Sequence, residues 1–97
     1  MPKRAKNHPV AYTDYEREIA EAMGTRLHTR RKELQLTQEQ VRERMAAAHI
    51  LITRTQFSRI ENGDSLLYAT ELIAIATALD MSYQWLLDGE APVEPER

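Results

Sequence analysis

The chain of 97 residues contains no cysteine, which excludes a disulfide framework and any metal site built from thiolates. Long apolar runs are also missing, since none approaches the roughly 20 residues needed to span a bilayer. The start of the chain is basic but lacks the hydrophobic stretch of a signal peptide. These absences together predict a cytoplasmic protein.

Side chains that would carry out catalysis or bind a metal ion are not grouped in the sequence. The three histidines, His8, His28 and His49, do not have the spacing of metal ligands. No cluster of serine, histidine and carboxylate indicates nucleophilic catalysis. We therefore expect no enzyme, no metal site and no cofactor.

Apolar residues recur with helical spacing, and the alternation typical of β-strands is absent. This periodicity predicts an all-α fold, in which Asp14 caps the first helix and Gly24 marks a break in it. The segments expected to be helical are 14–34, 38–48, 54–61, 68–79 and 82–88.

The two ends of the chain differ in composition from the rest. Residues 1–13 carry two prolines, three cations and few apolar groups, and they predict a flexible basic arm. Residues 90–97 are acidic and proline-rich, and they predict a disordered tail. The folded domain is expected between them, at residues 14–89.

The formal net charge of -2 is the sum of two segments of opposite sign. Residues 1–59 hold 12 Lys and Arg against 7 Asp and Glu, whereas residues 60–97 hold 1 against 8. Because phosphate affinity depends on the local field, the basic segment is compatible with DNA binding. Taken alone, this division of charge is better explained by the solubility of a helical protein. Only together with a motif in the basic segment does it favour DNA binding.

Such a motif lies at residues 36–63, which have the layout of two short helices joined by a turn. Thr37 is placed to cap the first helix, because its hydroxyl can accept from a backbone N–H that has no helical partner. Gln40 follows three residues later, as in a capping box. Val41 and Met45 then fall on one face of this helix, at i and i+4.

The second helix of the motif has an apolar and a polar side. Phe57 and Ile60 form its apolar stripe, and Asn62-Gly63 supplies a left-handed stop. Arginine can donate two hydrogen bonds to one guanine, and threonine can contact either base or the methyl group of thymine. A helix face that carries both is therefore suited to contacting the edges of bases. The polar side consists of Arg54, Thr55, Ser58 and Arg59.

Together these features resemble the lambda-repressor-like (Cro/C1, or XRE) helix-turn-helix family of DNA-binding proteins. The resemblance covers roughly residues 23–89, and it implies a five-helix domain whose first helix is extended at its N-terminus. No single mark is specific, and the resemblance rests on their order and spacing. The marks are Met23-Gly24, Leu27, Arg31 six residues before Thr37, Leu36-Thr37-Gln38, Ile60-Glu61-Asn62-Gly63, Leu72 with Ala76 and Leu79, and Trp85-Leu86-Leu87.

The resemblance implies which residues contact DNA. In the family, the glutamine at the position of Gln38 contacts a backbone phosphate, at a helix N-terminus that also attracts negative charge. The alternative for Gln38 is a hydrogen bond within the turn, and for the second helix it is a plain solvated face. The expected DNA-binding residues are Gln38, Thr53, Arg54, Thr55, Gln56 and Arg59.

Other arginines are expected to have different roles. In the resembled family, an arginine and a glutamate at the positions of Arg31 and Glu61 form a structural ion pair between the first and third helices. Removing the cation would leave a partly buried carboxylate unpaired, at a cost of a few kcal/mol. Arg26 and Arg30 are expected to be solvated.

The sequence departs from the family pattern between the two helices of the motif. Thr37 and Glu61 are 24 positions apart, about five more than is common in the resembled family. The surplus lies at residues 46–52, where alanines favour an extra helical turn followed by a longer connection. Among Ile50, Leu51 and Ile52, one or two are expected to enter the core or a partner surface.

The expected function is that of a sequence-specific transcriptional regulator, a repressor in the commoner case, that binds double-stranded DNA as a homodimer. Its recognition helices would enter major grooves of a pseudo-palindromic operator, about one helical turn apart. Two alternatives remain: an antitoxin that neutralises a toxin and regulates its own operon, and a restriction–modification controller protein. A toxin would be bound by the extension at residues 14–23 or by the acidic tail.

Overall fold

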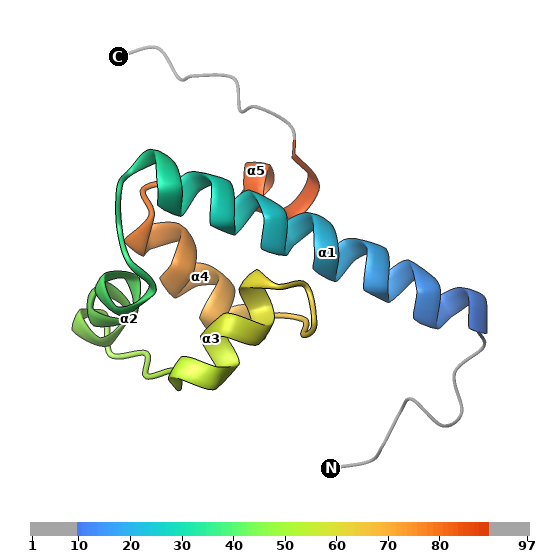
Figure 1. The fold of residues 1–97 in the computed structure, drawn as a ribbon, viewed down its shortest axis with the longest axis horizontal. Coiled ribbons are helices and arrows are strands. Elements are labelled where there is room, and N and C mark those ends of the chain that lie inside the picture. Colours follow the sequence, from blue (N-terminus) through green and yellow to red (C-terminus); the bar gives the residue numbers. More distant parts are fainter. Residues whose placement is uncertain (1–9, 90–97) are drawn as a thin grey trace.

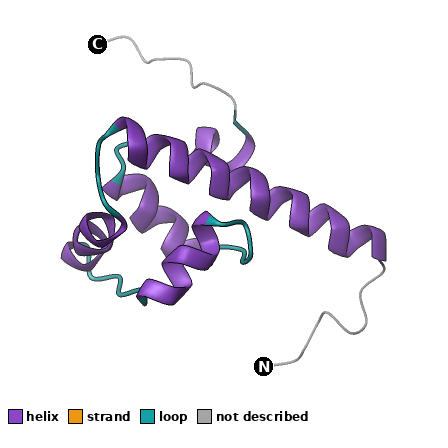
Figure 2. Ribbon diagram, viewed as in Figure 1, coloured by secondary structure: helices purple, strands orange, loops and turns teal. Residues whose placement is uncertain are grey.

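The computed structural model describes residues 10–89, and in this part of the chain the regular secondary structure consists only of helices, which are joined by loops (Figure 2). The basic segment at residues 1–9 and the tail expected at residues 90–97 lie outside the described residues. The five helices are α1 (Val10–Glu33), α2 (Gln38–Ala47), α3 (Arg54–Glu61), α4 (Ala69–Ala78) and α5 (Tyr83–Asp88).

The first helix begins earlier than its expected start at Asp14. It includes residues 10–13, which had been assigned to the arm, and it has 24 residues in all. These four residues contain neither glycine nor proline, so the helix extends towards the N-terminus as far as the residue after Pro9. At 1.5 Å per residue, α1 is about 36 Å long.

The long helix α1 runs along one side of a group formed by α2, α3 and α4, with α5 at its opposite edge in this view, and its N-terminal turns project beyond them (Figure 1). It packs against α3 and α5, while α2 packs against α3 and α4. The fifth helix also contacts α4. This arrangement places the α2–α3 pair on one side of the domain.

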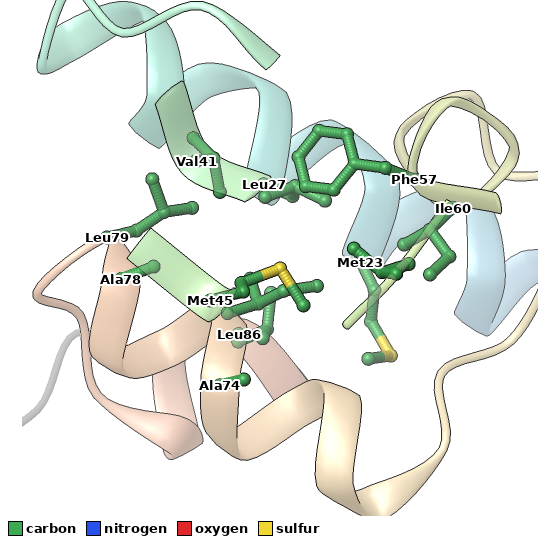
Figure 3. Packing of buried hydrophobic residues seen from close by; sticks show 12 residues of the cluster. Met23, Leu27, Val41, Met45, Phe57, Ile60, Ala74, Ala78, Leu79 and Leu86 are labelled. Carbon is green, nitrogen blue, oxygen red and sulfur yellow. The ribbon is translucent and has the colours of Figure 1, made fainter. Parts of the chain in front are cut away.

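The core lies where the five helices meet, and Figure 3 shows side chains that fill it. Val41 and Met45 of α2 and Phe57 and Ile60 of α3 are almost completely buried, as the helical spacing predicted. Burying one such side chain contributes about 1.5–3 kcal/mol. The other fully buried large side chains are Leu27, Ile75, Leu79 and Leu86.

The expected break at Gly24 is wrong, because α1 continues through this residue. The glycine instead permits close packing: a Cβ atom here would lie 2.7 Å from the carbonyl oxygens of both Ile60 and Glu61. Gly24 therefore allows α1 to contact the end of α3.

The connection between α2 and α3 is fixed at both ends. The second helix ends in a turn in which His49 has a left-handed φ of 69° and the Ile50 amide donates to the Met45 carbonyl, 3.0 Å away. Ile50 is half-buried and Ile52 is buried, whereas Leu51 is 85% exposed. Two of the three apolar residues therefore pack against the core, in agreement with the prediction.

The expectation that Arg26 and Arg30 are solvated is wrong, since both are half-buried. Arg26 donates from Nη1 to the carbonyl oxygen of Leu86 in α5, at 3.0 Å. Arg30 donates to the carbonyl oxygens of Leu79 and Asp80 at the end of α4, at 2.9 and 3.0 Å. Carbonyl groups at helix ends have no intrahelical donor, so these two arginines hold α1 to both helices.

No helix in the described residues is long and apolar enough to cross a membrane.

Candidate nucleic-acid interface

The start of α2 is held by the capping box that the sequence predicted. The hydroxyl of Thr37 accepts from the backbone N–H of Gln40 at 3.0 Å, and the Gln40 side chain accepts from the Thr37 backbone N–H at 2.8 Å. Val41 and Met45 anchor the helix in the core below this cap. Gln38, the first residue of α2, is therefore fixed relative to the rest of the domain.

The start of α3 is held in a similar way. Thr53 caps the helix, and its hydroxyl accepts from the backbone N–H of Gln56 at 3.0 Å. The Gln56 side chain is half-buried and donates to the hydroxyl of Ser65 at 3.2 Å. Thr53 and Gln56, which were both expected to bind DNA, thus have hydrogen bonds within the protein.

The outer face of α3 is polar and accessible. Arg54, Thr55 and Arg59 are exposed, and neither arginine side chain has a hydrogen bond or ion pair with another described residue. Gln38 of α2 joins them, although it is 16 positions before Arg54 in the chain. The residues that line this one open depression are Gln38, Arg54, Thr55, Ser58 and Arg59.

Ser58 is part of this surface but was not among the expected DNA-binding residues. It is half-buried, and it lies three residues after Thr55 and four after Arg54, on the same side of α3. The helical spacing is therefore the signal that places it there.

Behind the depression, Arg31 and Glu61 form a bidentate ion pair between α1 and α3. Arg31 Nε lies 2.7 Å from Glu61 Oε2, and Arg31 Nη2 lies 3.1 Å from Glu61 Oε1. The same guanidinium donates from Nη1 to the Leu36 carbonyl at 2.9 Å, just before α2. Because both side chains are buried, this pair connects α1, the start of α2 and the end of α3.

Gln38 is also bound to this ion pair, since its side-chain amide donates to Glu61 Oε1. The amide nitrogen carries two hydrogens, so a second can still be donated to another acceptor. The contact sets the direction of the Gln38 side chain at the edge of the depression.

The carboxylate of Glu61 is stabilised in its charged form. Burial favours the neutral acid, but hydrogen bonds from Arg31 and Gln38, with the positive charges of Arg31 and His28, outweigh it. These contacts hold the pKa of Glu61 below its ordinary value of 4.5. Glu61 is therefore ionised at neutral pH.

His28 is a member of this cluster that the sequence did not indicate. Its Nδ1 lies 3.2 Å from Glu61 Oε2, and the imidazole is half exposed. It lies three residues before Arg31 on α1, so both can face the same carboxylate. This spacing was the available signal, but nothing local shows that Glu61 lies opposite.

Most of the other arginines in the basic segment have partners within the protein. Arg42 donates from Nε to the Ile52 carbonyl at 3.1 Å, and Arg44 donates from Nη1 to the Ala78 carbonyl at 2.9 Å. Arg26, Arg30 and Arg31 are bound as described above. These five arginines therefore hydrogen-bond within the described part of the fold, and the outward charge of the depression comes from Arg54 and Arg59 of α3.

Within the described residues, no group of three histidine, aspartate or glutamate side chains could hold a metal ion.

The fixed α2–α3 pair and its exposed polar helix face define a helix-turn-helix domain. A family model described as a helix-turn-helix domain matches residues 24–92, which is most of the chain. The protein belongs to this family of DNA-binding domains, which is of the XRE, or Cro/C1-like, type. The comparisons with curated proteins and with solved structures found no match.

Proposed function

We propose that the protein is a sequence-specific transcriptional regulator, a repressor, that inserts α3 into the major groove of its operator. The observation that carries this proposal is the depression in which Gln38 of α2 meets the exposed residues of α3. Its two arginines have no partner among the described residues, so their donors are available for base edges. A major groove is wide enough to admit such a helix.

The six expected DNA-binding residues divide into three groups on structural grounds. Arg54, Thr55 and Arg59 are the candidates for base contacts, because they are exposed on the outer face of α3. Gln38 is the candidate for a phosphate contact. Its side-chain amide donates one hydrogen to Glu61, and the second hydrogen is available for a phosphate oxygen. The cap and the bond to Ser65 support a role for Thr53 and Gln56 in positioning α3.

We also propose that the protein binds a pseudo-palindromic operator as a homodimer. One recognition helix of eight residues buries too little surface for the tight binding that a regulator needs at its operator, so two subunits are required. Tyr83 and Leu87 support a contact through α5, since they lie one turn apart and are each 50% exposed. The two half-sites would be about one helical turn of DNA apart.

A protein partner such as a toxin is a second candidate, favoured by the N-terminal turns of α1. These turns project beyond the other helices (Figure 1), and Tyr15 on them is 60% exposed. A toxin-like reading frame beside the gene would support this candidate, whereas a methyltransferase or endonuclease would favour a restriction–modification controller.

The experiment that tests the proposed function is selection of bound sites from random double-stranded DNA. We expect a conserved site with two related halves, and tight binding at physiological salt. Enrichment of no sequence over the starting pool would contradict sequence-specific binding. A single half-site bound with nanomolar affinity by a monomer, as measured by sedimentation, would contradict the dimer.

A further inference from the structure

His28 lies beside the carboxylate that holds Gln38, and the proposed function does not use it. Its Nδ1 is 3.2 Å from Oε2 of Glu61 and 3.4 Å from Nη2 of Arg31. The His28 side chain is 51% exposed, whereas that of Glu61 is 3% exposed. The imidazole is therefore the part of this cluster that responds directly to the solvent.

One ring nitrogen cannot satisfy both contacts in a single protonation state. Nδ1 can donate to Glu61 only when it carries a hydrogen, and it can accept from Arg31 only when it does not. The imidazolium carries hydrogens on both ring nitrogens, so protonation selects the contact with Glu61. The neutral ring selects the contact with Arg31 when its hydrogen is on Nε2, and it donates to Glu61 without a charge when its hydrogen is on Nδ1.

A hydrogen on Nδ1 of His28, which the imidazolium always carries, completes the set of donors around Glu61. Oε2 then accepts from Arg31 Nε and His28 Nδ1, while Oε1 accepts from Arg31 Nη2 and Gln38 Nε2. A carboxylate has about four lone-pair positions, so all of them are occupied. Gln38 then donates to Oε1, which it shares with Arg31 Nη2, on a carboxylate whose acceptor positions are all occupied.

We propose that His28 is a positioning residue of the DNA-binding surface, and that its protonation strengthens DNA binding through Glu61 and Gln38. The inference rests on the proposed function, because it deepens the role of Gln38 in holding a phosphate. The charged groups that face His28 are Glu61 of α3 and Arg31 of its own helix, and Gln38 of α2 is uncharged.

Charge makes the direction of the effect definite. With His28 protonated, the positive charges of His28 and Arg31 and the negative charge of Glu61 leave one net positive charge beside Gln38. With His28 neutral, the cluster has no net charge. A phosphate at Gln38 is therefore held more strongly at lower pH.

The test is the affinity for the selected site, measured at constant ionic strength between about pH 5.5 and 8. We expect wild-type affinity to fall by about two- to fivefold per subunit as the pH rises, the size of one solvent-exposed charge interaction. His28→Gln is neutral throughout, and His28→Lys is charged throughout. Both variants should bind with affinities that do not follow the pH.

His49 provides the matched control, because it is an exposed histidine in the connection that leads to α3. His49→Gln should keep the full pH dependence, and His8→Gln should also keep it. A pH dependence that persists in His28→Gln, or that disappears in His49→Gln, would overturn the assignment to His28.

A second measurement tests the route through Gln38. In Gln38→Ala the pH dependence should shrink, because the phosphate is no longer held beside the cluster. If it persisted in full, His28 would act on DNA by another route and the positioning role would be wrong. A wild type that selects a site but binds it equally at every pH overturns this inference alone, whereas one that selects no site overturns the proposed function as well.

Discussion

Gly24 of α1 lies so close to Ile60 of α3 that a Cβ atom on the glycine would be 2.7 Å from the Ile60 carbonyl oxygen. The carbonyl oxygen of Glu61 would be equally close, at 2.7 Å. Both are backbone atoms, so they cannot give way unless the end of α3 moves. This contact sets the distance between the helices that carry Arg31 and Glu61, and so the geometry behind the DNA-binding surface.

Gly24→Ala should therefore destabilise the domain, although alanine is the better helix former by about 1 kcal/mol. We expect a loss of about 1–3 kcal/mol in the free energy of unfolding, as for overpacking elsewhere. Urea denaturation measures it, and Thr25→Ala is the matched control because Thr25 is the exposed neighbour. A Gly24→Ala protein as stable as the wild type would show that the two helices can separate without cost.

The helices could largely be predicted from the sequence, because their boundaries depend on local signals. The bounds of α3 were predicted correctly, and those of α2, α4 and α5 to within one residue. The capping box at Thr37 and the glycine stop after α3 are read within a few residues of the chain. Such signals act over a single helical turn, so they are visible without the fold.

The errors at Gly24, Arg30 and His28 have the opposite origin, since they concern partners that are distant in sequence. Gly24 reads locally as a helix breaker, and only α3 shows why a glycine is needed. Arg30 reads as a solvated cation, and its carbonyl partners are 49 and 50 residues away. His28 reads as a lone histidine for the same reason, because Glu61 is 33 residues away. Tertiary contacts of this kind leave no periodic pattern in the sequence.

The Arg31–Glu61 pair should be structural. Arg31→Ala removes two donors from a buried carboxylate, so we expect the free energy of unfolding to fall by about 3 kcal/mol. Base preference should not change among the molecules that stay folded. Arg17→Ala is the control, because its ion pair with Asp14 is exposed and should contribute less than about 1 kcal/mol. A normal melting curve with lost DNA binding would instead make Arg31 a phosphate contact.

Stability should depend on acid through Glu61. Its pKa is lowered in the folded state, so folding favours the ionised form. This stabilisation is present above the ordinary pKa of 4.5 and is lost as the pH falls below that value. The wild type should thus be more stable than Glu61→Gln at neutral pH, and the gap should narrow in acid.

Urea denaturation from about pH 7 down to about pH 3 measures this gap. The control is Glu43→Gln, because Glu43 is exposed on α2 and should leave the pH dependence of the wild type nearly unchanged. A gap that stayed constant through the titration of the carboxylates would show that the charge of Glu61 is not what stabilises the fold.

The recognition helix should determine which DNA sequence is bound. Arg54→Ala and Arg59→Ala should each cost about 1–3 kcal/mol on the best site and relax the base preference. Gln38→Ala should instead weaken binding to all sequences to a similar degree, because a phosphate contact carries no sequence information. Competition against scrambled DNA separates the two effects. Full preference in both arginine variants would mean that another surface reads the bases.

Dimerisation should depend on the exposed apolar residues of α5. Leu87→Glu places a charge on a half-exposed leucine one turn after Tyr83, so it should prevent burial of this face against a second copy. We expect sedimentation to show a monomer and the affinity for the full operator to fall strongly. The melting temperature of the variant should be close to that of the wild type diluted until it is monomeric. Leu51→Glu is the control, since Leu51 is more exposed, at 85%, but lies on the α2–α3 connection. Should Tyr15→Glu on the projecting part of α1 give the monomer while Leu87→Glu does not, the contact would belong to that extension.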